Sequence, residues 1–357
     1  MRKIIILTLT IFGFSLAKGV ASRFVLGRPE TIIINWLDQC RIQKPYRYQN
    51  LTLFPIVTNR QSRFEYLTLE EGLKCQYLEI TELGSGEVNK VRVRNQSKYY
   101  IFGLAGELIL GAKQDRMLKE DVLLPPFSGW LEIPVYCTEH GRWTAQTPKF
   151  YSRGLIVPGM LRQTARKTES QVEVWQEVDR FHTKLNIHSP TKALKEVYEA
   201  SRVFDLGKPY LRELIAVPSQ IENIIGVVVV VGDRIICADL FANHSLLEKM
   251  WEKLLRSYVI DAIAEPKDNG ITINQVEQFL KSIRDCNFTN LPTPGAGQLV
   301  RFKSKSRHKF FKPSVVGSAL IFRDDVVHLD LFPQVSDFAS EPQPIPRLDI
   351  RRERLYR

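Results

Sequence analysis

The amino-acid sequence predicts an α+β fold, in which a β-rich, sandwich-like N-terminal half packs against an α+β C-terminal half with two similar β-hairpins and amphipathic helices. Between residues 51 and 162, short apolar or alternating runs are separated by turn residues, without a long helical pattern. Further along, apolar residues recur every three or four positions, which is typical of amphipathic helices. Closely spaced short strands without helices favour a sandwich or a barrel.

The composition is that of a globular protein. The chain has 357 residues, of which 44% are hydrophobic and 25% charged, enough for one large domain or two ordinary ones. Its net charge of +11 favours an anionic partner such as nucleic acid, an anionic glycan or a phospholipid surface. The sequence carries no H-E-x-x-H, G-x-S-x-G, G-x-G-x-x-G or EF-hand motif, so it shows no signature of the enzymes and binding proteins that these motifs define.

Residues 1–17 have the pattern of a secretory signal peptide. The first three residues carry two positive charges, and an apolar run follows from Ile4 to Ala17, with small side chains at Ser15 and Ala17 where a signal peptidase reads the chain. The run is shorter than the roughly 20 residues that a membrane-spanning helix needs. We therefore expect a periplasmic or secreted bacterial protein. An uncleaved membrane anchor and a buried N-terminal strand are the alternatives.

Residues 18–50 form a lead-in segment, whose Trp36, Leu37 and Tyr46 are expected to dock onto the following core. The β-rich half then spans residues 51–165. Its expected strands are the apolar or alternating runs Leu51–Val57, Val91–Val93, Tyr99–Leu104, Val122–Leu124 and Leu131–Cys137.

The α+β half spans residues 166–332, and residues 333–357 are expected to be a disordered basic tail, rich in proline and then arginine. Periodic apolar residues and capping patterns predict four helices in this half. They are an amphipathic helix over Val172–Leu185, a second opened by Ser189-Pro190, a long helix through Trp251 opened by a capping box of Ser245 and Glu248, and a shorter one opened by Thr272 and Gln275.

The two hairpins of this half look like copies of one unit. Gly226–Phe241 aligns on Gly317–Phe332 without a gap, with turns expected at Gly232-Asp233 and Asp324-Asp325. Chance similarity between hydrophobic hairpins is the alternative to duplication. Duplicated hairpins are expected to pair in one sheet, with the Trp251 helix packed on it. Asp239 and Asp330 are then equivalent, and they either form a carboxylate pair for acid/base chemistry or each cap the next turn or helix.

The five cysteines, at positions 40, 75, 137, 237 and 286, lie far apart and include no CxxC pair. This spacing excludes a zinc ribbon or a thioredoxin-type motif. The cysteines act either as buried small hydrophobic residues or, in an oxidising compartment, as partners in one or two disulfides. The sequence predicts neither a metal site nor a cofactor.

The densest polar segment is Gly106–Arg116. Its two glycines and lysine superficially match a phosphate-binding loop, but the lysine is displaced by one residue and no Ser or Thr follows it. The segment still supplies most of a candidate polar site, for which an ion-paired surface loop is the alternative. The site consists of Glu107, Lys113, Gln114, Asp115, Arg116 and His140.

The neighbourhood of His140 invites a nucleophile or metal interpretation, because Cys137, Glu139 and His140 lie within four residues. The strand alternation that ends at Cys137 argues against it, since the thiol is expected to face the core. Trp143 is expected to be a core anchor as well.

A second candidate site is basic. Lysines and arginines alternate with phenylalanines near residues 301–312, a composition that can bind a polyanion or form a solvated connection between strands. The candidate anion-binding patch consists of Arg301, Lys303, Lys305, Arg307, Lys309 and Lys312.

Several blocks in a fixed order resemble the ARG- and rhodanese-phosphatase-superfamily-associated protein domain family over about residues 45–332. The blocks are Asn50–Ile56, Tyr66–Glu71, Leu104–Arg116, Asp121–Pro126, Ile133–Trp143, Gly226–Phe241 and the Trp251 helix. The resemblance implies that the segments 106–116 and 137–143 matter to the fold or to a shared site. It suggests ADP-ribose or nucleotide-related processing in the cytoplasm, a picture from which the apparent signal peptide departs. It carries over no catalytic residue.

No catalytic constellation emerges, so the sequence leaves open whether the protein is an enzyme. We expect a non-enzymatic binding or scaffold protein of the cell envelope with an anionic partner. Nucleic acid is disfavoured for an exported chain, and no transmembrane span is expected after signal cleavage. The alternative is a hydrolase or binding protein for ADP-ribose-like or other phosphorylated small molecules, which convergence of the polar-site side chains in one pocket would favour.

Overall fold

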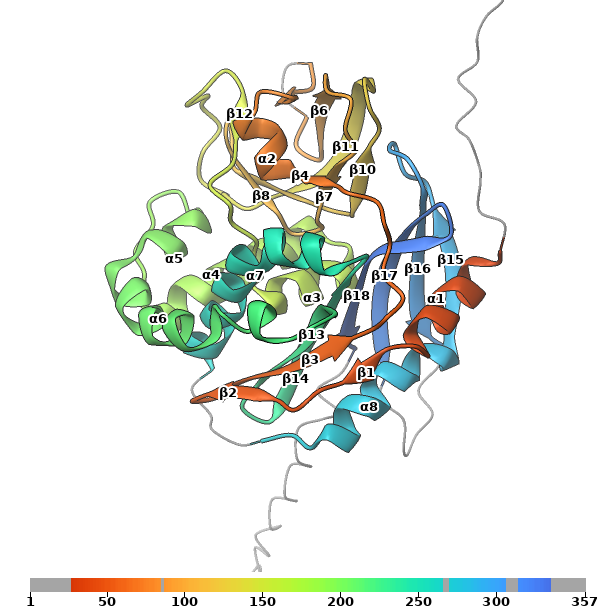
Figure 1. Cartoon of the computed structure of the whole chain (residues 1–357). Helices are drawn as coiled ribbons and strands as arrows, with labels where there is room; N and C mark the ends of the chain where they lie inside the picture. The colour runs from red at the N-terminus through yellow and green to blue at the C-terminus, as the bar shows by residue number, and fades with distance from the viewer. Residues whose placement is uncertain (1–26, 85–86, 266–269, 306–313, 335–357) are drawn as a thin grey trace, which may run out of the picture.

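The computed structural model describes residues 27–84, 87–265, 270–305 and 314–334. The expected signal peptide, the tail from residue 335 onward, and Arg307, Lys309 and Lys312 of the basic patch lie outside the described residues. The predicted α+β class is confirmed, because helices and antiparallel sheets both contribute large parts of the described chain (Figure 1).

A nine-stranded sheet, antiparallel at every pairing, organises the molecule. Its strands are β1 (Arg41–Ile42), β2 (Tyr46–Tyr48), β3 (Leu51–Val57), β13 (Ile224–Val231), β14 (Arg234–Phe241), β15 (Cys286–Leu291), β16 (Gln298–Ser304), β17 (Val315–Phe322) and β18 (Asp325–Pro333). They lie in the order β1-β3-β13-β14-β18-β17-β16-β15, and β2 also pairs with β3. Strands β13, β14, β17 and β18 are buried almost throughout, which explains why most of their residues are apolar.

The two hairpins meet at the centre of this sheet, where β14 pairs with β18 and Asp239 lies opposite Asp330. Each hairpin has a register shift at the equivalent place, between Val229 and Val230 in one and between Leu320 and Ile321 in the other. Neighbouring strands extend the symmetry, since β3 flanks the first hairpin and β16 the second. Equivalent bulges in equivalent hairpins favour duplication over chance similarity.

Helices cover both faces of the large sheet (Figure 1). On one face, α1 (Pro29–Leu37) and α8 (Ile273–Lys281) pack through Ile33, Trp36, Val276 and Phe279. On the other face lies α7 (His244–Ala264), whose Trp251 and Leu254 pack on the valines of β13, as predicted for the Trp251 helix. The lead-in segment thus docks on the core as expected, through Trp36 and the partly buried Leu37 and Tyr46.

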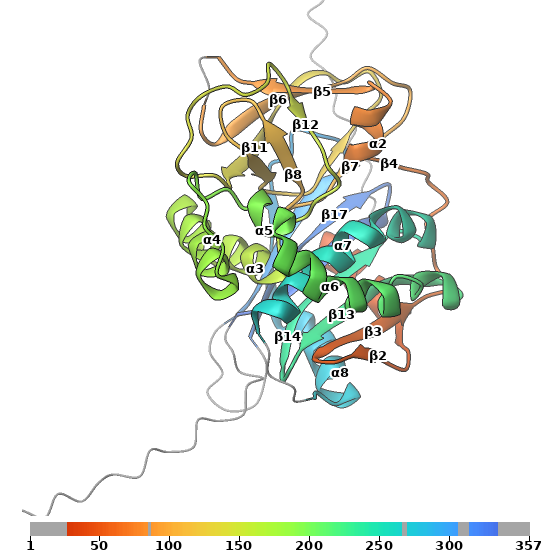
Figure 2. The same ribbon diagram turned by 90° about the vertical axis from the view of Figure 1, so that its left-hand side faces the viewer.

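Further helices extend this second layer, and Figure 2 shows them below the β-rich unit. They are α3 (Gly159–Thr168), α4 (Gln171–Leu185), α5 (Lys195–Glu199) and α6 (Ser201–Leu214), followed by the short 3₁₀ helix η1 (Pro218–Gln220). A second 3₁₀ helix, η2 (Ser282–Asp285), links α8 to β15. The predicted helix over 172–185 is confirmed as α4.

Two predicted helix starts and one predicted turn are wrong. Asn243, not Ser245, caps α7, because its side chain accepts a hydrogen bond from the Leu246 amide at 2.9 Å. Ser189 accepts from the Ala193 amide and closes a turn, so α5 begins only at Lys195. The second hairpin turns at Arg323-Asp324, where both residues have positive φ, one position earlier than expected. The capping box of Thr272 and Gln275 is confirmed.

The β-rich unit is sandwich-like, as predicted. Its three-stranded sheet consists of β4 (Leu67–Thr68), β7 (Ile101–Gly103) and β10 (Val122–Leu124), with the short helix α2 (Leu69–Lys74) beside it. Its six-stranded sheet consists of β5 (Leu78–Glu82), β6 (Lys90–Asn95), β8 (Leu108–Gly111), β9 (Arg116–Leu118), β11 (Gly129–Cys137) and β12 (Phe150–Tyr151). Side chains of both sheets share one apolar core, which includes Ile101, Val122, Val93 and Val135.

One strand lies elsewhere than the sequence grouping suggests. Leu51–Val57, placed with the β-rich half, forms β3 of the large sheet and pairs along its length with β13. Six of its seven residues are buried, which suits a strand covered on both faces. The β-rich unit and helices α3–α6 therefore all lie in the connection between two neighbouring strands, β3 and β13.

All five cysteines are free thiols in the structure. Cys137, Cys237 and Cys286 are buried, Cys40 is partly exposed and Cys75 is exposed. Three of the five therefore behave as the buried small residues that the sequence allowed.

Candidate functional site

The most unusual feature of the structure is a network of charged side chains at the junction of the large sheet, the helical layer and the β-rich unit. We call it the central network. It consists of the cations Arg162, Arg166, Lys253, Arg301 and His328 and the carboxylates Glu107, Glu120, Asp121, Asp239 and Asp330. Most of these side chains are buried, whereas charged residues normally lie at the surface.

Asp239 lies at the centre of the network on β14. Arg162 of α3 donates to both of its carboxylate oxygens, at 2.7 and 2.6 Å, and Tyr258 of α7 donates at 2.6 Å. Burial alone would raise the pKa of Asp239, but the Arg162 guanidinium outweighs it and holds this pKa far below its usual range. The carboxylate is therefore ionised at neutral pH.

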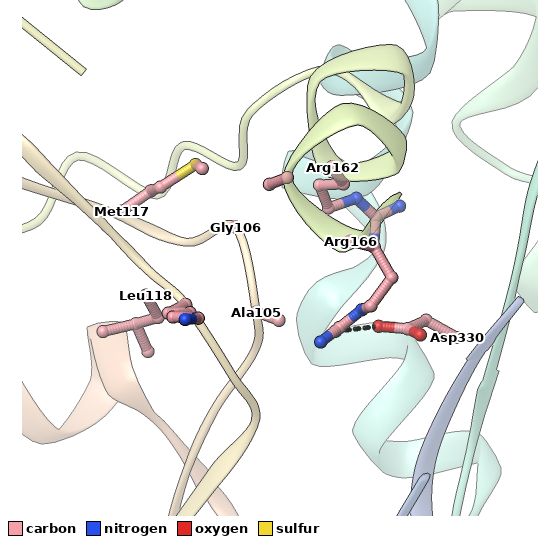
Figure 3. Close-up of a pocket in the computed structure, with 9 residues that line it drawn as sticks. Ala105, Gly106, Met117, Leu118, Arg162, Arg166 and Asp330 are labelled. Atoms are coloured by element: carbon pink, nitrogen blue, oxygen red, sulfur yellow. Dashed lines mark hydrogen bonds and ion pairs between the residues drawn. The ribbon is translucent and has the colours of Figure 1, made fainter. Parts of the chain in front are cut away.

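Asp330 is held in an equivalent way by the next turn of α3. Arg166, four residues after Arg162, contacts the Asp330 carboxylate at 2.5 Å, and Ser318 donates its backbone amide to the other oxygen at 2.7 Å. Figure 3 shows Arg162 and Arg166 projecting from one helix face, with Arg166 bridged to Asp330. Arg166 and Arg301 also both bind Glu120 of the β-rich unit. One helix thus contributes a cation to each copy of the duplicated aspartate.

His328, also on β18, connects the sheet to the β-rich unit. Its Nδ1 lies 2.7 Å from Asp121, and its Nε2 lies 3.4 Å from Asp239. Burial by itself lowers the pKa of the imidazole, but Asp121 and Asp239 outweigh burial and raise it to about 9. With His328 protonated, the central network contains five cations and five carboxylates, so it is electrically balanced.

This arrangement predicts that the protein loses stability as the pH rises from neutral to about 9. The pKa of His328 is raised from 6.5 to about 9, so its contribution is fully present below pH 6.5 and disappears as the pH passes through 9. The shift corresponds to about 3 kcal/mol. Denaturant unfolding at pH 7 and at pH 9 measures this loss, and His328→Gln is expected to abolish the His328-dependent part. An equal pH slope in both proteins would contradict the assignment.

Asp239 and Asp330 take neither of the two roles expected from the sequence, a carboxylate pair for acid/base chemistry or a cap of the next turn or helix. They are brought side by side, but each is bound by its own arginine, so they do not share a proton as acid/base pairs do. Their side chains also do not cap a following turn, because their partners lie on α3, α7, β17 and β18.

The central network leaves little room for a ligand. The crevice beside it is lined by Gly106, Lys119, Arg162, Arg166 and Asp330, and it encloses about 10 Å³, roughly the space of one water molecule (Figure 3). Within the described parts of the chain, no group of three or more His, Cys, Asp or Glu residues is arranged to hold a metal ion. A nucleotide cannot enter without a rearrangement.

Five of the six residues of the predicted polar site divide among three places, and the sixth, Lys113, lies over the Trp143 ring at 5.3 Å. Gln114, Asp115 and Arg116 lie in a second buried cluster, the β8–β9 cluster, which we define as these residues with Glu82, Cys137, Glu139, Arg142 and Lys195. Glu107 instead belongs to the central network, where it binds Lys253. His140 is exposed and stacks on Trp175 with ring centroids 4.3 Å apart.

Two of the three cations of the β8–β9 cluster, Arg142 and Lys195, pair closely with its carboxylates, whereas Arg116 lies 3.9 Å from Glu82. Arg142 forms a two-pronged contact with Glu139, at 2.8 and 2.5 Å, and also reaches Asp115 at 3.3 Å, while Lys195 lies 3.0 Å from the other oxygen of Asp115. The pKa of Asp115 is raised chiefly by burial. Arg116 contacts Gln114 at 2.8 Å and the thiol of Cys137 at 2.7 Å. Three cations and three carboxylates again balance.

The Cys137 thiol faces the interior, as the strand alternation predicted. Burial raises its pKa to about 11 even though Arg116 is adjacent, so the thiolate that a nucleophile requires is scarce at neutral pH. The expectation for Trp143 is wrong. Its side chain is 47% exposed and lies over Lys113 and Arg116, because the segment after β11 runs along the surface.

The described part of the basic patch is not one continuous solvated surface. Arg301 bonds to Glu120 and Glu169 at 2.5 Å each, so it contributes to the central network. Lys303 is exposed on β16, and the Lys305 amide bonds to the Asp285 carbonyl.

The cations that neutralise the duplicated aspartates were not predicted from the sequence. Arg162 and Arg166 lie on α3, which carries too few apolar residues to predict a helix. The two arginines are four residues apart and follow Pro158-Gly159, where the helix begins. This spacing could have predicted that both side chains lie on one helix face.

Comparison with known proteins adds one result. Residues 39–332 match the model of a family described as the ARG and Rhodanese-Phosphatase-superfamily-associated Protein domain. No curated protein and no solved structure matches the chain.

Proposed function

The chain belongs to the ARG and rhodanese-phosphatase-superfamily-associated protein domain family, and from this membership and the site geometry we propose that it is a non-enzymatic binding or scaffold protein with an anionic partner. The proposal rests on one observation: in each of the two buried charged clusters, the number of cations equals the number of carboxylates. Neither therefore accounts for any of the net charge of +11. That excess belongs to the rest of the chain, where it is available to a partner.

Further observations support binding over catalysis. The residues of the predicted polar site do not converge in one pocket. Asp330, the carboxylate that borders the crevice, is paired with Arg166, and the buried Cys137 thiol has a raised pKa. A general acid or base needs a group with a free proton site near a substrate, and a nucleophile needs access.

We place the protein in the cell envelope, as an exported chain. This part of the proposal rests on residues 1–17, which lie outside the described residues. In the part of the chain that the structure describes, no helix is long and apolar enough to cross a lipid bilayer.

A second candidate is a protein that binds ADP-ribose-like or other phosphorylated small molecules. One observation favours it: the crevice beside the central network is lined by three cations, Lys119, Arg162 and Arg166, and by one carboxylate, Asp330. Its small volume counts against it.

Thermal unfolding with added ligands separates the two candidates. The binding proposal predicts salt-sensitive association with several polyanions, such as heparin and dextran sulfate, and no stabilisation by ADP-ribose. A saturable, salt-resistant stabilisation by ADP-ribose that is lost in Lys119→Ala would overturn it. Lys119 is suitable because its side chain is 29% exposed at the crevice, so its removal leaves the buried pairs intact.

A further inference from the structure

One surface of the β-rich unit carries an unusual group of exposed aromatic side chains. Phe127 is 70% exposed, Tyr99 43%, and Tyr77 and Trp130 38% each. They come from the chain around β5, β6 and β11, and they surround one buried residue, Asn95. We call this group the aromatic tip.

Asn95 holds the aromatic tip rigid. Its side-chain amide donates to the carbonyls of Tyr99, Leu124 and Pro125 at 2.7, 3.3 and 2.9 Å, and its side-chain oxygen accepts from the Ser97 amide and hydroxyl. The Phe127 amide in turn donates to the Ser97 carbonyl at 3.0 Å. The rings are therefore presented on a fixed scaffold rather than on a loose loop.

Phe127 is unfavourable for folding in two ways. Its φ of +49° lies in the left-handed region, which a bulky side chain rarely adopts. Its ring also stays mostly in water. A glycine would relieve the backbone strain. Because the phenyl ring stays mostly in water, it also adds little to the stability of the fold. Strained, exposed residues of this kind cluster at functional sites.

Cationic side chains surround the rings. Lys98 lies over Tyr99 at 5.3 Å, and the guanidinium carbons of Arg92 and Arg94 lie 4.6 and 4.7 Å from the centre of the Trp130 ring. Two carboxylates share this sheet face, Glu79 and Glu132, which pair with Arg94 and Lys90. Lys149 also binds Glu79. Five cations therefore face two carboxylates, and the surface is net positive.

We propose that the aromatic tip docks on an anionic phospholipid bilayer, with the Phe127 ring inserted and Tyr99 and Trp130 at headgroup level. This inference deepens the proposed function by naming the anionic partner. An apolar ring flanked by amphipathic aromatics and cations is the composition of protein surfaces at membrane interfaces. A sugar-binding platform fits less well, because it needs an open indole face, and the Trp130 ring is already contacted by two guanidiniums.

The test uses Phe127→Gly and vesicle sedimentation. The chain is produced from residue 18, because the apolar run before it would itself bind lipid, and every contact described here lies within that chain. We expect wild-type protein to bind phosphatidylcholine vesicles that contain phosphatidylglycerol, and to bind pure phosphatidylcholine vesicles weakly. Phe127→Gly is expected to lower the partition coefficient about tenfold or more, because the variant has no phenyl ring to transfer from water into the bilayer.

Two controls separate binding from folding. Phe127→Gly is expected to unfold at a higher temperature than wild type, because the left-handed strain is relieved, so weaker binding cannot reflect misfolding. Phe204→Ala removes a ring that is 62% exposed on α6, away from the aromatic tip, and is expected to leave the partition unchanged. Lys98→Ala is expected to reduce binding about fivefold to the anionic vesicles only.

Unchanged vesicle binding by Phe127→Gly overturns the inference. If vesicles do not bind but an acidic polysaccharide such as polygalacturonate does, the lipid assignment fails while the proposed function stands. If no polyanion of either kind binds, the proposed function fails as well.

Discussion

Asp239→Ala is expected to destabilise the protein by about 3–5 kcal/mol, the range for breaking a buried ion pair by removing one partner. The substitution leaves the Arg162 guanidinium buried without its carboxylate, removes the acceptor of the Tyr258 hydroxyl, and takes one negative charge from beside His328. Urea unfolding at pH 7 measures the loss, and a comparable loss is expected for Arg162→Ala.

Two comparisons sharpen this prediction. Replacing both partners, as in Asp239→Leu with Arg162→Met, is expected to recover much of the stability, because no unpaired charge remains buried. Arg256→Ala removes a surface pair with Glu252, in which both side chains are well exposed, and is expected to change stability by less than about 0.5 kcal/mol. Equal losses for the buried and the surface substitution would refute the importance assigned to the central network.

The second large loss of stability is expected at Gly226 and Gly317, which occupy equivalent positions in the duplicated hairpins. A Cβ atom at Gly226 would lie 2.1 Å from the Asp239 carbonyl oxygen, and one at Gly317 would lie 2.2 Å from the Asp330 carbonyl oxygen. Both clashes are with the backbone of a buried neighbouring strand, which cannot rotate away. Gly226→Ala and Gly317→Ala are each expected to cost about 3 kcal/mol, the upper end of typical overpacking penalties.

Thermal or denaturant unfolding of the two variants checks both the size and the symmetry of the effect. Gly270→Ala is the matched control, because its Cβ would meet only the Arg47 guanidinium, at 3.6 Å, and it is expected to be neutral or slightly stabilising. If either buried variant proves as stable as Gly270→Ala, the close approach of the strands is not the reason that glycine occupies these positions.

The sequence predicted those parts of the fold whose signal is local. The hairpins, the Trp251 helix and most short strands follow from apolar periodicity and turn residues. Helix α6 was not predicted because Gly207 and Pro209 interrupt the helical pattern of its sequence. Its stability comes from packing against α7. The position of β3 beside β13 was equally hidden, since pairing between distant strands leaves no local trace.

The candidate site was predicted less well, for a related reason. The segment 106–116 suggested one polar surface, but its charged residues find buried partners far away in the chain, as Glu107 does with Lys253. A charge pattern in sequence does not show whether its partners lie in solvent or in the core. The alignment of the hairpins did identify Asp239 and Asp330 as equivalent, but their partners Arg162 and Arg166 lie on α3, far from both aspartates in the sequence.

The long connection between β3 and β13 has a consequence for the order of folding. The second copy of the repeat is a meander, in which β15 through β18 pair with their immediate successors, so each contact closes a short loop. The first copy cannot form in this way, because residues 58–223 separate β3 from its partner β13. Loop-closure entropy grows with the length of the loop, and distant pairings slow folding. The C-terminal meander is therefore the natural nucleus, and β3 joins the sheet late, once the intervening unit has collapsed.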